Sequence, residues 1–320
     1  MPMDLEQLRN KIRGPVFPIV TPFTHDFRLD LDKIREYIDY LYAGGARIFH
    51  IMVHTSRFGL LTYDEMQALN RTVASHVKRH YSDCVVIAAD PLYKPTQISV
   101  DFAKSAEDSG ADIIGLIFME RLYFDDQVYD FFETVARSCN IGILIHEQQL
   151  NTIHGTTLVP FPLELLKRIA GIDNVIAIKE DAKDDQYTHE VVSALRDHLA
   201  IIVSGGSKEQ FMQFGPMGCQ AYLVGVASFD PEIALTFYKA HEEKDTGRCW
   251  EIINTLERPF FEVSKRLGWH IGLKSAMELL GIMSRIERPP LAMLPEKNHQ
   301  EIRDILFHIG YGPRIANTSP

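Results

Sequence analysis

The sequence has 320 residues, of which 46% are hydrophobic and 24% are charged, a composition typical of a globular protein with a large core. Its net charge of -10 argues against a nucleic-acid partner, which would favour a basic face. No apolar stretch approaches the ~20 residues of a membrane span, and the N-terminus lacks an apolar secretory core. The four cysteines are widely spaced, with no CxxC pair, so we expect a cytoplasmic protein without a membrane partner.

Short apolar runs recur along most of the chain and predict buried strands. They are Val16 to Thr21, Arg47 to Val53, Val85 to Ala89, Ile113 to Phe118, Ile141 to His146, Val175 to Lys179, Ile201 to Ser204 and Ala221 to Val224. Helical patterns separate them, at Leu31 to Leu41, Tyr63 to Val77, Gln97 to Ser109, Val128 to Ser138, Leu163 to Ile169, Thr188 to His198 and Lys208 to Phe214. Thr62 and Glu65 form a capping-box pattern at the start of the second of these helices.

This unbroken alternation predicts an α/β protein with a (β/α)8 TIM barrel. The main alternative, a doubly wound open sheet, usually has fewer strands and a glycine fingerprint after its first strand, and Pro18 to Phe23 contains no glycine. Beyond Asp230 the pattern is purely helical, at Pro231 to His241, Arg248 to Leu267, Leu273 to Gly281 and His299 to Ile309. We therefore predict a barrel over residues 1–230 and a C-terminal helical extension over residues 231–320.

Polar residues follow several of the predicted strands, at the end of the barrel where active sites form. They are His54-Thr55-Ser56-Arg57 after the second strand, Glu120-Arg121 after the fourth, His146-Glu147 at the end of the fifth, Lys179-Glu180-Asp181 at the end of the sixth, Ser204-Gly205 after the seventh, and the segment that follows Val224. The topology alone predicts that these residues meet on one face. We expect His50, which lies before this edge, to pack between barrel and helices.

Lys179 is the most informative of these residues because it ends an apolar run and should be partly desolvated. Desolvation lowers the pKa of an amine, and a neutral amine can attack a carbonyl. Neutrality near pH 7 requires a pKa lowered by about 3, or roughly 4 kcal/mol. Glu180 and Asp181 would oppose this change if they faced the amine, so we expect both to point elsewhere. The alternative is a surface lysine whose apolar stem alone is buried.

The same edge offers a candidate acid or base, His146 or His54, and hydroxyl or amide donors for an anion. These groups suit imine chemistry on a 2-oxo acid, in which the lysine attacks the keto carbon and a second group moves a proton at the neighbouring carbon. The alternative for His146 is a hydrogen-bonded histidine of the core.

Several segments, in this order and spacing, are similar to segments of one known family: Gly14 to Phe23, Leu61 to Glu65, Ile178 to Glu180, Ser204 to Gly206, Phe229 to Glu232, Gly272 to Lys274 and Arg288 to Pro290. Over roughly Gly14 to Leu294, the chain resembles the dihydrodipicolinate synthase and N-acetylneuraminate lyase family of class I aldolases. The resemblance implies a Schiff base on Lys179, no metal or organic cofactor, and a homotetramer built as a dimer of dimers.

The chain departs from the family pattern at three places around the expected site. The family has a Gly-Thr-Thr-Gly-Glu type of loop that holds the substrate carboxylate, and only Thr55 is retained in the matching stretch, residues 53–57. The family's relay tyrosine, followed by Asn, is replaced by His146-Glu147, and its Pro-Tyr-Tyr motif by residues 118–121. These changes argue against dihydrodipicolinate synthase activity and against sialic-acid cleavage.

We therefore expect a lyase, either an aldolase or a dehydratase, that forms an imine between Lys179 and a 2-oxo acid such as pyruvate or a keto-deoxy sugar acid. His146 would replace the relay tyrosine, with His54 as its partner. The expected substrate-binding residues are Thr55, Ser56, Arg57, Glu120, Ser204, Gly205 and Val224. For Arg57 and Glu120 the alternative is salt bridging within the loops.

Two other functions stay open. A degenerate family member could bind a small oxo acid without turning it over. A metal-dependent barrel lyase or hydrolase could use Glu120, His146, Glu147 or Asp181 as ligands, although no ligand-spaced pair of histidines supports it on these strands.

Overall fold

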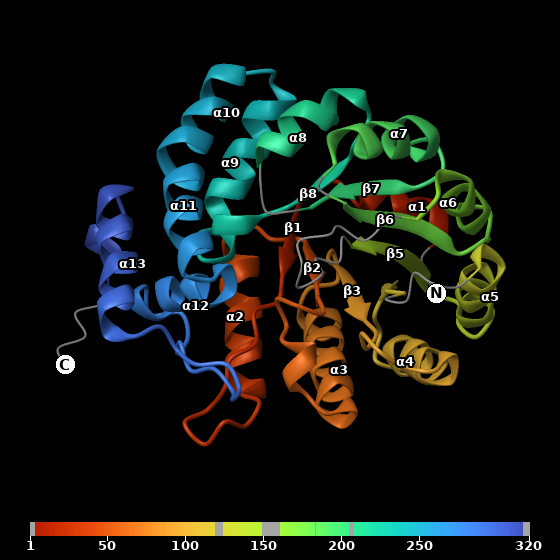
Figure 1. The fold of residues 1–320 in the computed structure, drawn as a ribbon, viewed down its shortest axis with the longest axis horizontal. Helices are drawn as coiled ribbons and strands as arrows, with labels where there is room; N and C mark the ends of the chain where they lie inside the picture. Colours follow the sequence, from red (N-terminus) through yellow and green to blue (C-terminus); the bar gives the residue numbers. More distant parts are fainter. Residues whose placement is uncertain (1–3, 119–123, 149–160, 183, 205–207, 316–320) are drawn as a thin grey trace.

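The computed structural model describes residues 4–118, 124–148, 161–182, 184–204 and 208–315. Eight parallel strands close into a barrel in the order β1 to β8, which confirms the predicted (β/α)8 fold (Figure 1). The strands are β1 Gly14–Pro18, β2 Ile48–His50, β3 Val85–Ala89, β4 Ile113–Leu116, β5 Gly142–Gln148, β6 Val175–Asp181, β7 Ala200–Val203 and β8 Ala221–Leu223. Two of them, β5 and β6, extend two residues beyond their predicted ends, and this extension shapes the site.

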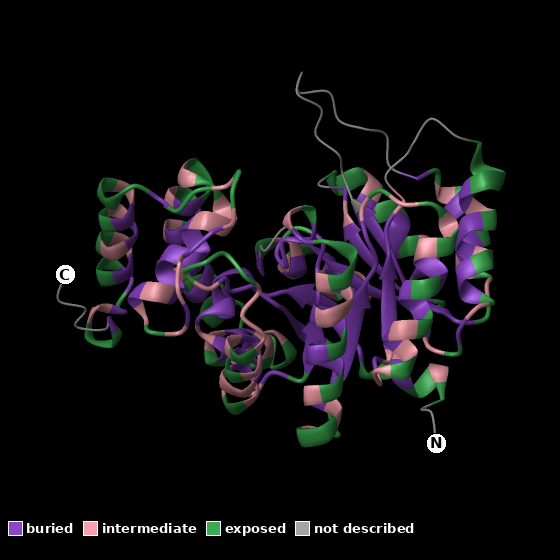
Figure 2. Cartoon of the chain, turned by 90° about the horizontal axis from the view of Figure 1, so that it is seen from below, coloured by how far each residue is buried: buried purple, intermediate pink, exposed green. Residues whose placement is uncertain are grey.

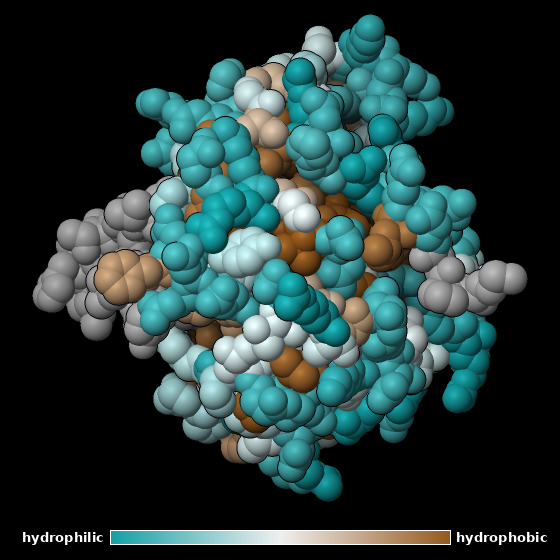
Figure 3. Space-filling view, turned by 90° about the vertical axis from the view of Figure 1, so that its right-hand side faces the viewer, coloured by the Kyte–Doolittle hydropathy of each residue, from teal (hydrophilic) through white to brown (hydrophobic). Residues whose placement is uncertain are grey.

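Helices follow the strands and surround the barrel. They are α2 Leu31–Ala43, α3 Tyr63–His80, α4 Thr96–Asp108, α5 Asp125–Ala136, α6 Leu163–Ala170, α7 Asp185–Leu195 and α8 Lys208–Phe214, with single 3-10 turns at Phe58–Leu60, Gly215–Met217, Gly225–Ser228 and Gly312–Arg314. The predicted capping box starts α3, because Thr62 Oγ1 accepts from the Glu65 amide at 3.3 Å and Glu65 Oε2 accepts from the Thr62 amide at 3.0 Å. Figure 3, which views the side that carries α5 and α6, shows hydrophilic side chains outermost and apolar ones between them.

Alternation along the strands separates two apolar cores, because successive side chains point to opposite faces. On β5, Ile143 and Ile145 pack outward against the helices, whereas Leu144 packs inside the barrel. The strands are buried on both faces, as Figure 2 shows. Helix α1 (Leu5–Lys11), which we did not predict, adds Leu8 to the inner core and closes the barrel at the N-terminal ends of the strands.

The C-terminal segment is helical, as expected, but its elements differ in detail. They are α9 Pro231–Glu242, α10 Thr246–Ile252, the π-helical segment η4 Ile253–Glu257, α11 Arg258–Leu267, α12 Trp269–Leu279 and α13 Glu296–His308. Helix α9 packs on the barrel, since Tyr222 donates from its hydroxyl to the Ala234 carbonyl at 2.8 Å. It therefore occupies the place of the eighth barrel helix, and α10 to α13 lie to one side (Figure 1).

Helix α12 is held closely against α11. Gly268, at φ 100, makes the sharp connection between them. A Cβ at Gly272 would lie 3.0 Å from Ser264 Cβ, so glycine permits this close approach. The Trp269 ring stacks on Phe261 with 4.4 Å between centroids, which fixes the first turn of α12. In the described parts of the chain, no helix has the length and apolar character needed to span a membrane.

Candidate active site

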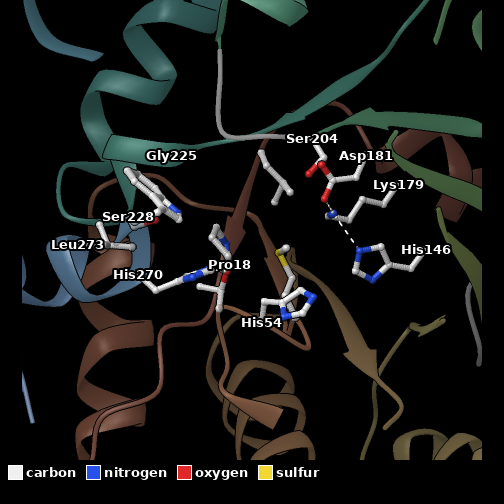
Figure 4. Close-up of a pocket in the computed structure, with 14 residues that line it drawn as sticks. Pro18, His54, His146, Lys179, Asp181, Ser204, Gly225, Ser228, His270 and Leu273 are labelled. Carbon is white, nitrogen blue, oxygen red and sulfur yellow. Dashed lines mark hydrogen bonds and ion pairs between the residues drawn. The ribbon is translucent and has the colours of Figure 1, made fainter. Parts of the chain in front are cut away.

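A cavity of about 180 Å³ opens at the C-terminal ends of the strands (Figure 4). This volume is below the ~300–1,000 Å³ typical of pockets for drug-sized ligands, so it suits a small molecule. The described residues that line it come from six strand ends and from α12: Pro18, Met52, His54, Thr55, His146, Lys179, Asp181, Ser204, Leu223, Gly225, Ser228, Trp269, His270 and Leu273.

Lys179 lies at the base of this cavity and is completely buried. Its strand is paired with β5 so that Lys179 stands directly beside His146. The Lys179 Nζ lies 2.9 Å from His146 Nε2 and 2.9 Å from Asp181 Oδ2 (Figure 4). An imidazole and a carboxylate are thus both within hydrogen-bonding distance of the Lys179 amine.

The two acidic residues after Lys179 behave differently. Glu180 points away, as expected, because its carboxylate accepts from Thr188 Oγ1 and from the Ala182 amide, each at 2.7 Å. Burial raises the pKa of Glu180. The expectation that Asp181 also points elsewhere is wrong. Since β6 continues to Asp181, this residue shares the inward face of the strand with Lys179, two positions earlier.

His50 lies inside the barrel, which corrects the expectation that it packs between barrel and helices. It follows the inward residue Ile48 by two positions, and its Nε2 is 3.5 Å from where a Cβ at Gly115 would lie. Burial, together with the charge of Lys179, lowers the pKa of His50 to about 3. The ring is therefore neutral near pH 7 and adds no second positive charge beneath Lys179.

The turn after β2 presents Thr55 to the cavity and uses the next residue as an anchor. Thr55 lines the cavity, and its Oγ1 lies 3.2 Å from His270 Nε2. Ser56 does not line it: its hydroxyl donates to the Ile19 carbonyl at 2.6 Å and accepts from the Met52 amide at 3.0 Å. The structure thus brings Thr55 into the site and gives Ser56 a structural position behind it.

Arg57 also turns away from the cavity. It has φ 60, and its guanidinium contacts the buried carboxylate of Glu287, with Nη2 at 2.5 Å and Nε at 3.2 Å from Oε1. Lys274 Nζ lies 3.6 Å from the same oxygen, and burial lowers the pKa of Lys274 to about 8. These contacts match the salt-bridging alternative for Arg57, and they tie the turn after β2 to the C-terminal segment.

The remaining sequence candidates fall into three groups. His54 and Ser204 line the cavity, His54 with an exposed side chain and Ser204 almost buried. Val224 does not line it and is buried in the outer core. Glu120, Arg121 and Gly205 lie outside the described residues.

Sequence reasoning missed a large part of the lining. Asp181 could have been found from its two-residue spacing to Lys179. Trp269, His270 and Leu273 carried no such signal, because α12 belongs to the C-terminal extension and reaches the cavity only through tertiary packing. Gly225 and Ser228, in the turn after β8, were identified at a strand end but not as site residues.

In the described ranges, no group of three or more His, Cys, Asp or Glu side chains is arranged to hold a metal ion. Glu147 is buried and follows the inward residue His146, so it points to the other face of β5. His146 and Asp181 both contact Lys179.

Comparison with known proteins agrees with this architecture. Residues 11–309 match the model of the dihydrodipicolinate synthetase family. An uncharacterized DapA-like lyase of Thermococcus onnurineus is 23% identical, with 94% of this chain and 100% of the relative covered. A probable 5-dehydro-4-deoxyglucarate dehydratase of Rhizobium meliloti is 24% identical, with 95% of this chain and 98% of the relative covered.

Among solved structures, YagE of E. coli K12, in complex with pyruvate, superposes with a TM-score of 0.80 at 20% identity, over 93% of this chain and 98% of YagE. This likeness concerns the fold. The family match extends over nearly the whole chain, and members of the family are lyases. The chain therefore belongs to the dihydrodipicolinate synthetase family, as a divergent member in which a histidine stands beside the strand-end lysine.

Proposed function

We propose that this protein is a class I lyase that forms a Schiff base between Lys179 and a 2-oxo acid. The observation that carries the proposal is the position of Lys179 Nζ, buried at the base of the cavity and 2.9 Å from both His146 Nε2 and Asp181 Oδ2. A nucleophilic amine needs a nearby group that takes its proton, and two candidates for that role are in contact with it.

In the proposed first stage, Asp181 accepts a proton from the ammonium of Lys179, and the neutral amine attacks C2 of the 2-oxo acid. The oxygen of the resulting carbinolamine takes one proton from protonated His146 and one from the amine nitrogen, and it leaves as water. The products of this stage are a protonated imine on Lys179, one water molecule, protonated Asp181 and neutral His146, so atoms and charge balance. Imine formation makes C2 an electron sink for the next stage.

In the second stage, His146 moves a proton at C3 or at an oxygen beyond it. Loss of the C3 proton gives an enamine, which can add to an aldehyde or expel a hydroxyl group as water; reversal of the aldehyde addition is aldol cleavage. An imidazole suits both directions of proton transfer because its unperturbed pKa of about 6.5 is near the working pH. His146 would thereby replace the tyrosine that the family resemblance leads one to expect there.

Thr55 is proposed to hold the substrate carboxylate, with Ser204 and His54 as further polar groups of the same cavity. The substrate class is a small 2-oxo acid such as pyruvate, or a keto-deoxy sugar acid. The relatives named as dehydratases of a keto-deoxy sugar acid and the pyruvate complex of YagE support this class. Aldol cleavage, condensation and dehydration all pass through the same imine.

Exchange of the C3 protons of pyruvate with deuterated solvent, followed by NMR, tests the proposal without requiring the second substrate. We expect exchange by the native protein and none by Lys179→Ala, which must retain a native unfolding transition. Full exchange by Lys179→Ala would end the proposal. Stabilisation by an oxo acid without exchange across a broad panel would favour a non-catalytic binder, and activity lost on chelation would favour a metal-dependent enzyme.

The assembly and location expected from the sequence also stand as proposals. A homotetramer gives a mass of about four times the 36.5 kDa of the chain in light scattering coupled to gel filtration. A cytoplasmic location is tested by fractionation of the source cells.

A further inference from the structure

His270 is an unexpected member of the cavity wall, because it comes from α12, far from the barrel strands in the sequence. Its Nε2 lies 3.2 Å from Thr55 Oγ1, and both residues line the same cavity as Lys179. In Figure 4, His270 projects into the cavity from the side opposite His146 and Lys179. His146 thus lies beside the Lys179 amine, and His270 lies beside the Thr55 hydroxyl that is proposed to bind the substrate carboxylate.

Both partners of this contact are held in place by their surroundings. The anchored turn after β2 holds Thr55, and the packing of α12 holds His270. Ser56 anchors the turn to the end of β1, since its hydroxyl donates to the Ile19 carbonyl. Arg57 anchors the same turn to the C-terminal segment through Glu287. These two contacts are made by the two residues that directly follow Thr55, which is itself only 7% exposed.

On the other side, His270 lies in the first turn of a rigid helix. Trp269 stacks on Phe261, and Ser275 Oγ lies 2.6 Å from His299 Nδ1 of α13. Leu273 and Lys274, which follow within one turn, are each 1% exposed. The packing of α12 therefore fixes the backbone from which His270 projects.

The donors and acceptors of the two side chains determine which of them can donate the hydrogen bond while Thr55 also binds a substrate. A threonine hydroxyl has one hydrogen to donate, and a carboxylate can only accept. If Thr55 donated to His270, it could not also donate to a substrate carboxylate. If His270 carries its hydrogen on Nε2 and donates to Thr55 Oγ1, the hydroxyl hydrogen is available for the substrate.

We propose that His270 is a positioning residue for the substrate carboxylate: its Nε2–H donates to Thr55 Oγ1 and directs the Thr55 hydroxyl hydrogen toward that carboxylate. The inference rests on the proposed function, and it extends the site to a helix outside the barrel strands. It explains how one threonine can serve in a turn where the family resemblance leads one to expect two threonines flanked by glycines.

The test compares a ketone that has a carboxylate with one that lacks it. Pyruvate and acetone are each incubated with the protein and trapped by borohydride, and adduct is measured by intact mass as a function of ketone concentration. His270→Leu should raise the half-saturating pyruvate concentration roughly 10-fold, the size expected for loss of one charge-assisted hydrogen bond. Adduct at saturation should be retained, and trapping of acetone should be unchanged.

Two further variants separate positioning from a structural role. His270→Gln carries an amide N–H and should restore most of the pyruvate affinity, whereas His270→Glu, which can only accept, should be at least as impaired as His270→Leu. Thr55→Val removes the hydroxyl, so adding His270→Leu to it should cause no additional loss. Equal effects on pyruvate and acetone, or full additivity with Thr55→Val, would overturn the inference.

The failure of this inference is distinguishable from failure of the proposed function. If the native protein gives no adduct with acetone, pyruvate or longer 2-oxo acids, the imine proposal is wrong, and the carboxylate site is then read from the pyruvate dependence of the melting temperature. In that case, a shift of equal size in the native protein and in His270→Leu would overturn the role of His270. A shift that is weakened only in His270→Leu and restored in His270→Gln would support it.

Discussion

Lys179 on β6 and His146 on β5 are paired residues of neighbouring strands, and their side-chain nitrogens are 2.9 Å apart. Parallel strands in register place paired residues side by side, and both of these side chains face the inside of the barrel. The pairing brings a nucleophile and a proton-transfer group together without any contribution from a loop. Asp181 joins them because it is two residues beyond Lys179 on the same strand.

Replacing His146 with Gln should separate proton transfer from imine formation. The amide keeps a hydrogen-bonding group near Lys179 but has no useful acid–base chemistry, so we expect C3 exchange of pyruvate to fall by roughly 10² to 10⁴. Borohydride trapping should still give an adduct, formed more slowly because His146 also donates a proton during imine formation. His189→Gln, on the exposed surface of α7, is the control and should exchange at the native rate. Native exchange by His146→Gln would contradict the assigned role.

Replacing Asp181 with Asn should slow formation of the imine, because the amide cannot accept the proton of the Lys179 ammonium. We expect the rate of adduct formation with pyruvate at neutral pH to fall by about 10² or more. Raising the pH should recover part of this loss as solvent deprotonates the amine. The control is Asp185→Asn, which is exposed at the start of α7. An unchanged rate in Asp181→Asn would remove the carboxylate from the mechanism.

Replacing Glu287 with Gln should destabilise the fold, because it leaves the buried cations Arg57 and Lys274 without their shared carboxylate. Breaking a buried ion pair by removing one partner costs about 3–5 kcal/mol. Glu251→Gln, whose partner Arg248 is exposed, should change stability by less than about 1 kcal/mol. Urea unfolding measures both variants, and equal effects would mean that the buried cluster contributes no more than a surface pair.

The buried His50 should make the protein sensitive to acid. Its pKa of about 3 in the fold is below the 6.5 of an exposed histidine, so the unfolded chain binds more protons between these values. The contribution of the neutral His50 ring to the free energy of unfolding is fully present above pH 6.5, and it is lost as the pH falls toward 3. Between pH 7 and pH 4, the free energy of unfolding should fall by up to about 3 kcal/mol more in the native protein than in His50→Asn. Parallel pH profiles of the two proteins would contradict the assignment.

The barrel was predictable because its signals are local: apolar runs of strand length, helical periodicity and the capping box at Thr62. Lys179 and His146 were predictable as neighbours for the same reason, since strand order fixes which strand ends are adjacent. Asp181 was misjudged because β6 is longer than its apolar run, and a charged residue at a strand end does not show where the pairing stops.

Other parts of the site depend on contacts that no local pattern encodes. Arg57 was expected to face the substrate, but it pairs with Glu287, 230 residues later in the chain. His270 reaches Thr55 across 215 residues, through the packing of α12 on α11. Helix α1 was missed because a seven-residue helix gives little periodic signal.

Borohydride reduction in the presence of pyruvate tests the central claim most directly. After reduction, the intact mass shows whether one pyruvate is attached, and peptide mapping shows where. We predict a single adduct on Lys179, absent from Lys179→Ala. Lys274→Met, which removes a second buried lysine that lies outside the cavity, should retain the adduct. A folded protein that gives no adduct with pyruvate or with longer 2-oxo acids, or that carries it on another lysine, would contradict the account.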